Sequence, residues 1–251
     1  MTENIPPSDA GAMDLVLTCI RMAARDTNLY SFARADRGPL PSAEPGAHIG
    51  VILPNGIERQ YSLVQAAPQL SEYTVGVKRD ANSRGGSLFM HDQLRVGSSL
   101  KILPPRNNFP LKEDADHVVL MAGGIGITPI YCMLKRLMEK GRSWELYYSC
   151  RSRLDTAFLD ELSRHAQAHF HFDDEEAGRF LNVAGIVEKL PKNASRQQTS
   201  STFSADTSAA ASALRQTIGV PAMRRPTTSL VNTTIVATQI ASTTPRTRET
   251  R

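Results

Sequence analysis

The stretch from Val118 to Leu134 constrains the fold more than any other part of the 251-residue chain. An apolar run leads into Gly123, Gly124 and Gly126, and apolar residues at helical spacing follow Pro129. This pattern predicts a buried strand, a tight turn and a helix that begins near the proline, where a missing N–H costs nothing. Three interpretations stay open from this stretch alone. It is a phosphate-binding loop at a helix N-terminus, an ordinary buried turn, or a membrane span, although the run is short and interrupted.

The chain before this stretch has the pattern of short strands separated by turns rich in glycine and proline. Their even spacing predicts a small antiparallel β-barrel. One helix, Ser87 to Leu94, interrupts the series. The expected strands are Asp14 to Ala23, Leu29 to Ala35, Ala47 to Leu53, Glu58 to Val64, Glu72 to Val77 and Leu100 to Leu103.

After Asn108 the pattern changes to strands that alternate with helices, which predicts a parallel sheet in an α/β domain. Right-handed crossovers would place the loops after each strand at one edge of that sheet, where ligands bind. The expected elements are strand Val118 to Met121, helix Ile130 to Glu139, strand Trp144 to Tyr148, helix Thr156 to His165, strand Ala168 to Phe172 and a helix from about Asn182 to Leu190.

The pattern stops at Ala194. Of the 58 residues from there to Arg251, 21 are Ser or Thr, with one aromatic residue, Phe203. Such a segment buries too little apolar surface to offset its ordering entropy, so we expect a disordered tail. Seven arginines and two acids give this tail a net charge of +5, which leaves −1 for the rest of a chain whose total is +4. That near-neutral body argues against a nucleic-acid or membrane surface.

The three cysteines, Cys19, Cys132 and Cys150, are far apart and show no metal-ligand spacing, so no metal site is expected. Three thiolates are too few for an iron–sulfur cluster, and an odd, sparse count fits a reducing compartment. The N-terminus from Met1 to Asp14 is acidic and has no apolar core, so it does not resemble a signal peptide. We therefore expect a cytoplasmic protein.

Arg59, Tyr61 and Ser62 stand at one strand and offer a cation, a flat ring and a hydroxyl. Because side chains alternate along a strand, Arg59 and Tyr61 share a face. A planar polar ring that carries a phosphate chain would use these groups, with the guanidinium on the phosphate. The alternative is an ordinary edge strand with an exposed arginine and a half-buried tyrosine.

A second anion site is predicted where a charged turn leads through two glycines into the first helix. The alternative is a serine cap on a solvated helix. The residues of this second element are Val77, Lys78, Arg79, Gly85, Gly86 and Ser87.

Six motifs in this order resemble one known family. They are RQYS at Arg59 to Ser62, VKRD and RGGS within Val77 to Ser87, PPRNNFPL at Pro104 to Leu111, AGGIGITP at Ala122 to Pro129 and YSCRS at Tyr148 to Ser152. Together they closely resemble the reductase components of phthalate dioxygenase and vanillate O-demethylase type oxygenases, within the ferredoxin–NADP reductase superfamily. The resemblance covers roughly Asp14 to Leu190.

The resemblance implies a flavin-binding barrel, usually with FMN, an NADH-binding domain and a plant-type ferredoxin domain with a [2Fe–2S] cluster. Such a protein passes electrons from NADH through the flavin to a terminal oxygenase component or a ferredoxin, and it needs no acid–base side chain because the cofactors carry the chemistry. The domains expected on this basis are a flexible N-terminus at 1–12, the FMN barrel at 13–112, a partial NAD-binding domain at 113–191 and an atypical tail at 192–251.

Matching the motifs assigns each cofactor its residues in this sequence. Ser62 would lie near the reactive edge of the flavin, with Arg59 and Tyr61 beside it, and the second element would hold the ribityl phosphate. Thr128 would lie near the nicotinamide. The residues that would contact the pyridine nucleotide are Gly123, Gly124, Gly126, Thr128, Arg151, Ser152 and Asp173.

The acidic run from His171 to Glu176 favours NADH over NADPH, because carboxylates accept ribose hydroxyls and repel a 2′-phosphate. Arg151 and Arg153, which follow the preceding strand, argue the other way. For both groups an ordinary solvated loop is the alternative.

The chain departs from the family pattern after Pro191. The Cys-Gly-Pro strand end and the cysteine-rich cluster domain have no counterpart there. We therefore expect a frameshifted or truncated form with impaired activity, whose nucleotide sheet exposes an unpaired edge. The alternatives are a two-domain flavin reductase that uses a separate ferredoxin and a non-catalytic flavin-binding fragment.

Overall fold

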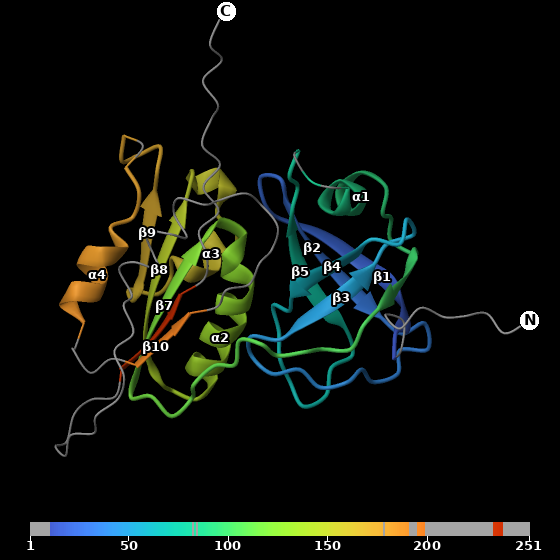
Figure 1. Ribbon diagram of the computed structural model, residues 1–251, viewed down its shortest axis with the longest axis horizontal. Helices are drawn as coiled ribbons and strands as arrows, with labels where there is room; N and C mark the ends of the chain where they lie inside the picture. The colour runs from blue at the N-terminus through green and yellow to red at the C-terminus, as the bar shows by residue number, and fades with distance from the viewer. Residues whose placement is uncertain are drawn as a thin grey trace, which may run out of the picture.

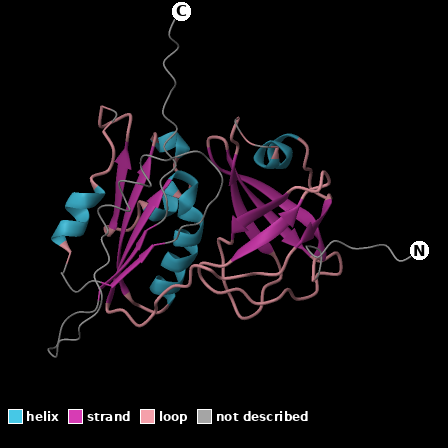
Figure 2. Cartoon of the chain, in the orientation of Figure 1, coloured by secondary structure: helices cyan, strands magenta, loops and turns pink. Residues whose placement is uncertain are grey.

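A computed structural model of the chain describes residues 11–81, 83, 85–177, 179–190, 195–198 and 233–237. Two β-rich units lie side by side, each with its own strands and helices (Figures 1 and 2). The first unit contains β1 (Met13–Ala24), β2 (Thr27–Ala33), β3 (His48–Ile52), β4 (Glu58–Ser62), β5 (Tyr73–Lys78), α1 (Gly86–Asp92) and β6 (Ser99–Ile102).

The first unit is the antiparallel barrel that the turn spacing predicts. Its six strands follow the order β4-β3-β6-β1-β2-β5. The two end strands meet just beyond β4, where the Val64 N–H donates to the Thr74 carbonyl at 3.0 Å and Leu63 bridges Val75. That closure leaves the barrel interior to large apolar side chains such as Tyr30 and Phe32, both fully buried.

The second unit contains β7 (His117–Gly123), the short 3-10 turn Gly124–Gly126, α2 (Ile127–Glu139), β8 (Ser143–Cys150), the 3-10 turn Arg153–Asp155, α3 (Leu159–Leu162), β9 (Ala168–Phe172) and α4 (Val183–Lys189). Its strands are parallel, as the alternating pattern predicts. Because β7 is buried on both faces, its side chains alternate between two layers. Val118, Leu120 and Ala122 pack with α2, whereas Val119 and Met121 pack with α4.

The expectation of an unpaired edge at β7 is wrong for the described backbone. Two short strands from beyond Ala194, β10 (Ser195–Gln198) and β11 (Thr233–Ala237), extend the sheet to the order β10-β11-β7-β8-β9. β11 lies parallel to β7, with Ile235 opposite Val119. The rest of the tail for which disorder was expected lies outside the described residues.

Two expected helix limits also change. α2 begins at Ile127, three residues earlier than predicted, because the glycine turn passes directly into the helix. The helix expected from Thr156 to His165 shrinks to α3, since Phe158 takes a left-handed φ of 62° and stacks on Tyr131 with ring centroids 3.9 Å apart. Single-residue propensity does not reveal such a tertiary contact.

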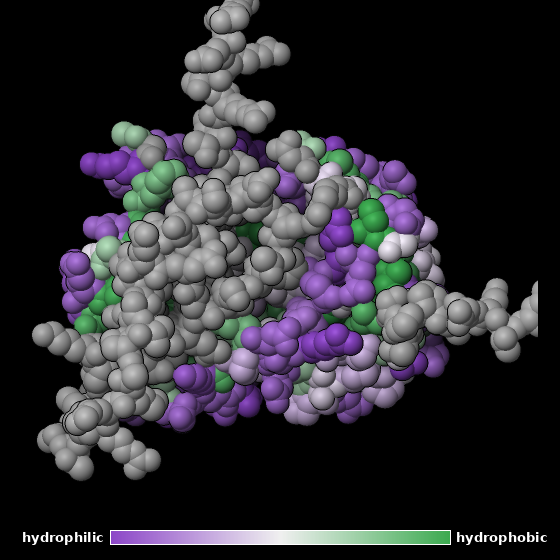
Figure 3. All heavy atoms as spheres, viewed as in Figure 1, coloured by the Kyte–Doolittle hydropathy of each residue, from purple (hydrophilic) through white to green (hydrophobic). Residues whose placement is uncertain are grey.

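The two units share a packed interface. Two barrel residues, Leu29 and Val64, belong to the same apolar cluster as α2. Gly46, at a φ of 95°, meets the linker so closely that an added Cβ would lie 1.9 Å from the Phe109 carbonyl oxygen. Outside this interface, the visible surface of the described barrel residues is largely hydrophilic, with smaller hydrophobic areas (Figure 3). The interface therefore fixes how loops from one unit face the other.

Candidate functional site

The first predicted motif lies on β4, at the end of the barrel sheet. Arg59 pairs with Val51 and Tyr61 pairs with Ile49 on β3, so the arginine and the tyrosine share a face as expected. Ser62 ends the strand opposite His48. Burial raises the pKa of Tyr61 to about 12.

The second motif meets the first at the start of α1. Gly85 precedes the helix with a φ of 93°, a conformation that favours glycine. An added Cβ at Gly86 would lie 2.8 Å from both Cγ and Nε of Arg59. The arginine stem therefore lies directly over the bare backbone of the helix start. The structure brings together two motifs that are separate in the sequence, and the pair forms a cradle that suits a phosphate.

Two side chains and one carbonyl group of the second motif already have partners in the barrel unit. The Ser87 hydroxyl accepts the Asp80 N–H at 3.1 Å. The Arg79 guanidinium forms two hydrogen bonds of 3.1 Å with the Asp92 carboxylate, and His91 Nε2 lies 2.9 Å from the Val77 carbonyl. Lys78, half-buried at the end of β5, follows Val77. The cradle itself consists of the backbone at the start of α1 and the stem of Arg59, whose Nη1 donates to the Glu58 carbonyl at 2.9 Å.

The glycine loop of the second unit runs from Gly123 at the end of β7 through Gly124 to Gly126 and into α2. Gly124 has a φ of 49°, and an added Cβ would meet no atom of the described residues within 4 Å, so that side of the loop is open among them. Fully buried Tyr148 donates from its hydroxyl to the Gly124 carbonyl at 3.1 Å and holds the loop in place. The loop thus presents bare backbone at a helix start, which suits a nucleotide.

Thr128 joins this loop to the barrel. Its hydroxyl donates to the Ile125 carbonyl at 3.1 Å. Its methyl group faces Gly76 on β5, where an added Cβ would lie 2.6 Å from Thr128 Cγ2. Sequence reasoning missed Gly76, although a glycine inside a strand pattern is a known sign of close approach by another segment. The residue that follows it, Val77, begins the second motif.

The acidic turn follows β9 and lies against the end of β8. The Asp173 N–H donates to the Cys150 carbonyl at 3.0 Å, and the Asp174 N–H donates to the Arg151 carbonyl at 3.1 Å. Asp173 Oδ1 is buried, and among the described residues no donor reaches it, since His171 Nε2 is 3.6 Å away. Burial raises the pKa of this carboxyl group. An unsatisfied buried acceptor suits a hydroxyl donor such as a ribose.

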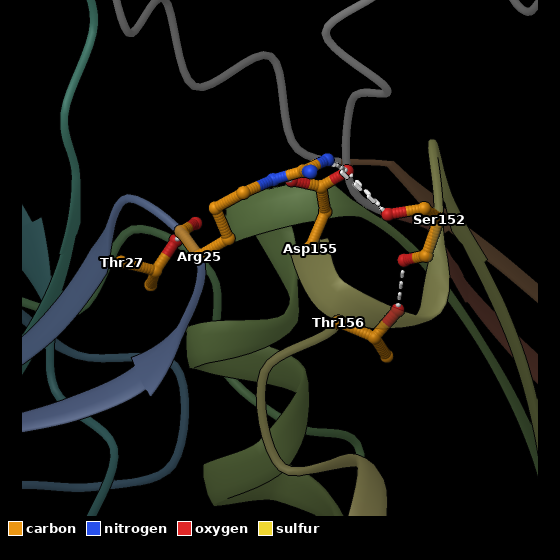
Figure 4. Close-up of polar contacts among 5 residues, drawn as sticks. All are labelled: Arg25, Thr27, Ser152, Asp155 and Thr156. Atoms are coloured by element: carbon orange, nitrogen blue, oxygen red, sulfur yellow. Dashed lines mark hydrogen bonds and ion pairs between the residues drawn. The ribbon is translucent and has the colours of Figure 1, made fainter.

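A cluster that sequence reasoning missed links the barrel to the loop after β8 (Figure 4). Arg25, in the turn between β1 and β2, donates to both carboxylate oxygens of Asp155, from Nε at 3.0 Å and from Nη2 at 2.7 Å. Ser152, predicted to face the nucleotide, donates its hydroxyl proton to Asp155 Oδ2 at 2.7 Å. No local pattern signals a pair 130 residues apart.

Among the described residues, no group of three or more metal-binding side chains forms. No helix in this part of the chain is long and apolar enough to cross a bilayer. Cys150, the last residue of β8, is buried, and burial raises its pKa.

Comparison with known proteins identifies clear relatives. Residues 120–202 match the family model described as "Oxidoreductase NAD-binding domain". The chain is 48% identical over 180 residues to the tetrachlorobenzoquinone reductase of Sphingobium chlorophenolicum, covering 70% of this chain and 56% of that protein. It is 41% identical over 180 residues, with the same coverage, to the vanillate O-demethylase oxidoreductase of a Pseudomonas strain. The chain thus spans little more than half the length of these relatives.

The fold gives the same result. A solved structure of phthalate dioxygenase reductase, described as modular and as transferring electrons from pyridine nucleotides to [2Fe–2S], superposes with a TM-score of 0.75 at 30% identity. The superposition covers 92% of this chain and 69% of the other. The match spans both units, the barrel and the parallel sheet.

Proposed function

The chain belongs to the family of phthalate dioxygenase reductase and related oxygenase reductases, and from this premise we propose that it transfers electrons from NADH through FMN to an iron–sulfur centre. The observation that carries the proposal is the contact between Thr128 and Gly76. It sets the nucleotide loop of one unit against the strand that leads into the phosphate cradle of the other. Two cofactors bound at these places would face each other across the interface.

The barrel side of this proposal assigns FMN to β4 and the start of α1. Arg59 and the backbone of Gly85, Gly86 and Ser87 hold the phosphate, with the turn Val77 to Arg79 alongside. Tyr61 lies against the flavin ring, and Ser62 lies near its reactive edge. The residues present fit this group, because Arg59 lies against the glycine at a helix start and supplies a counter-charge beside its backbone.

The nucleotide side assigns NADH to the loops after β7, β8 and β9. Gly123, Gly124 and Gly126 give the nicotinamide half a bare surface, and Thr128 fixes the loop beside the flavin. The nucleotide supplies the hydride, and the protein's part is to hold the two rings together and exclude water.

The loops after β8 and β9 supply the rest of the nucleotide site. Arg151 and the loop of Ser152 lie along the dinucleotide, and Asp173 accepts a ribose hydroxyl. Arg153 is not available to a 2′-phosphate, since its Nε and Nη2 bind the Glu175 carboxylate at 2.5 and 3.2 Å. That pairing favours NADH.

The electron acceptor lies outside these 251 residues, because the three cysteines are fewer than the four thiolates of a [2Fe–2S] cluster. The same count supports the second candidate, a two-domain reductase that donates to a separate ferredoxin. A terminal oxygenase component is the other acceptor. The non-enzymatic alternative is a flavin-binding fragment without turnover. We also propose a cytoplasmic location.

Purified protein tests these candidates. We expect a flavin absorption band, FMN on extraction, and rapid reduction of ferricyanide by NADH. Cytochrome c reduction should be slow unless a ferredoxin is added. A protein without a flavin band would rule out both enzyme candidates, and a flavin band without NADH oxidation would leave the flavin-binding fragment.

A further inference from the structure

We propose that Arg25, a residue of the flavin barrel, is a positioning residue for the nucleotide site of the other unit. It acts through Asp155, which it holds in the loop between β8 and α3 (Figure 4). This inference rests on the proposed function, since it concerns the nucleotide that the loop would bind. It makes the nucleotide site a joint product of both units.

The geometry of the pair is that of a specific contact. The guanidinium meets the carboxylate through two hydrogen bonds, the bidentate arrangement that combines strength with fixed orientation. The Asp155 side chain is only 8% exposed, whereas that of Arg25 is 50% exposed. Burial alone would raise the pKa of Asp155, but hydrogen bonds from Arg25 and Ser152 outweigh it and lower the pKa. The carboxylate is therefore charged and held at neutral pH.

The pair controls the shape of the whole loop. The Asp155 N–H donates to the Ser152 carbonyl at 3.1 Å, and the Thr156 hydroxyl donates to the same carbonyl at 2.8 Å. Arg25 Nη2 also lies 3.3 Å from the Ser152 hydroxyl. The two bonds to the Ser152 carbonyl close the turn, and the carboxylate of Asp155 ties that turn to Arg25 and to the Ser152 hydroxyl.

The barrel side is equally fixed. The Arg25 N–H donates to the Leu154 carbonyl at 2.8 Å, which adds a backbone bond between the units. The Asp26 carbonyl accepts the Arg79 N–H at 2.7 Å, and Arg79 ends the turn proposed to hold the flavin phosphate. The β1–β2 turn therefore contacts both the flavin turn and the nucleotide loop. A change at Arg25 reaches the nucleotide loop without removing any group proposed to touch a cofactor.

The first test is the affinity for NAD⁺ by calorimetry, which needs no turnover. We expect Arg25→Ala to weaken NAD⁺ binding about tenfold, below the hundredfold that a 1 Å misplacement can cost. Arg25→Lys should fall between, because lysine keeps the charge but loses the two-pronged geometry. Combining Arg25→Ala with Asp155→Ala should weaken binding no further than Asp155→Ala alone, because Arg25 acts through that carboxylate. The control is Arg164→Ala, which changes an exposed arginine of the nucleotide unit and should bind NAD⁺ as the wild type does.

The second test is hydrogen exchange without any ligand. The amides of Asp155 and Thr156 should exchange about tenfold faster in Arg25→Ala, while those of β7 stay unchanged, because only the loop is released. Flavin content and thermal midpoint should stay close to wild type. Unchanged exchange in the loop, or a faster exchange with unchanged NAD⁺ affinity, would overturn the inference.

The two tests also separate this inference from the proposed function. If the wild-type protein does not bind NAD⁺, the proposed function fails, and the nucleotide role of Arg25 fails with it. If the wild type binds NAD⁺ and Arg25→Ala binds equally well, only the inference fails.

Discussion

The two glycine-containing helix starts differ in what lies next to the bare backbone. At α1 the side of Gly86 is covered by the stem of Arg59, and the preceding loop is held by the hydroxyls of Ser83 and Ser87. At α2 the side of Gly124 opens onto empty space. One start is a walled cradle and the other is an open surface.

The helices behind them differ in the same sense. α1 has 7 residues and buries few of them, whereas α2 has 13 residues, of which 9 are buried between the sheet and the barrel. A short solvated helix with a side-chain wall suits a flavin that stays bound. A rigid helix with an open loop suits a nucleotide that must bind and leave in every turnover.

The largest expected effect is at the contact between the two sites. Gly76→Ala places a methyl group about 2.6 Å from Thr128 Cγ2, and the helix start must move away because Thr128 is buried. We expect about a hundredfold slower reduction of the flavin by NADH, as a small misplacement of reacting groups costs. Flavin content should not change. Anaerobic stopped-flow absorbance measures the rate.

The same contact supplies its own control. Thr128→Ser removes the methyl group that the new side chain would meet, so the double variant should recover most of the lost rate. If the flavin of the Gly76→Ala variant is reduced by NADH as fast as that of the wild type, the two sites do not depend on this contact.

A crossed pair of substitutions tests the difference between the helix starts. Gly86→Ala displaces Arg59 and should weaken FMN binding about tenfold without changing NAD⁺ affinity. Gly124→Ala forces a side chain into a left-handed conformation, at about 1 kcal/mol, and fills the open side of the loop. It should weaken NAD⁺ binding and leave FMN bound. Titration with FMN and with NAD⁺ measures the two affinities. If either variant lost affinity for both ligands equally, the two helix starts would not differ in the ligand they bind.

Much of this arrangement follows from local sequence. Alternation along β4 correctly predicts the shared face of Arg59 and Tyr61, and the glycine turns correctly predict that a helix follows each of them, although α2 begins three residues earlier than expected. The contacts between units do not follow, because Arg25 and Asp155 carry no periodic or positional signal. Phe158 shortens α3 for the same kind of reason, through a stack on Tyr131. Nothing in the composition of the tail predicts that β11 pairs with β7.

A smaller effect is expected at the hydroxyl that holds the open loop. Tyr148→Phe leaves the Gly124 carbonyl without its 3.1 Å donor, which should cost about 1 kcal/mol of unfolding free energy. NAD⁺ affinity should fall a few-fold, while FMN affinity stays the same. Urea unfolding and NAD⁺ titration measure the two.

The neighbouring Tyr147 is the matched control. Among the described residues its hydroxyl bonds only Glu145, at 3.3 Å, and not the loop, so Tyr147→Phe should change neither quantity. If both variants lost the same stability and affinity, the hydrogen bond to the loop would not be the cause.

The smallest effect concerns the free-energy cost of burying an ionisable side chain, which differs between the two sites. At the flavin site burial raises the pKa of Tyr61, which is neutral at pH 7 in any case. At the nucleotide site it raises the pKa of Asp173, so the charged carboxylate is disfavoured in the folded protein. A raised carboxyl pKa means that the folded state binds more protons than the unfolded state between the two pKa values. Stability associated with Asp173 therefore rises as the pH falls through its folded pKa, and is lowest above it.

Asp173→Asn removes that cost, so we expect it to raise the free energy of unfolding by about 0.5 kcal/mol at neutral pH. The gain should shrink as the pH falls and Asp173 becomes protonated in the wild type. Urea unfolding at neutral pH and at a series of lower pH values measures this gain in free energy of unfolding. Asp174→Asn is the control, because it removes a charge from the same turn. The NADH preference should weaken in the same variant, because the group that costs stability is the proposed ribose acceptor. If Asp173→Asn instead lowers the free energy of unfolding at neutral pH, a favourable contact holds the Asp173 carboxylate. The nucleotide site would then resemble the flavin site, where side chains already occupy the space beside the backbone.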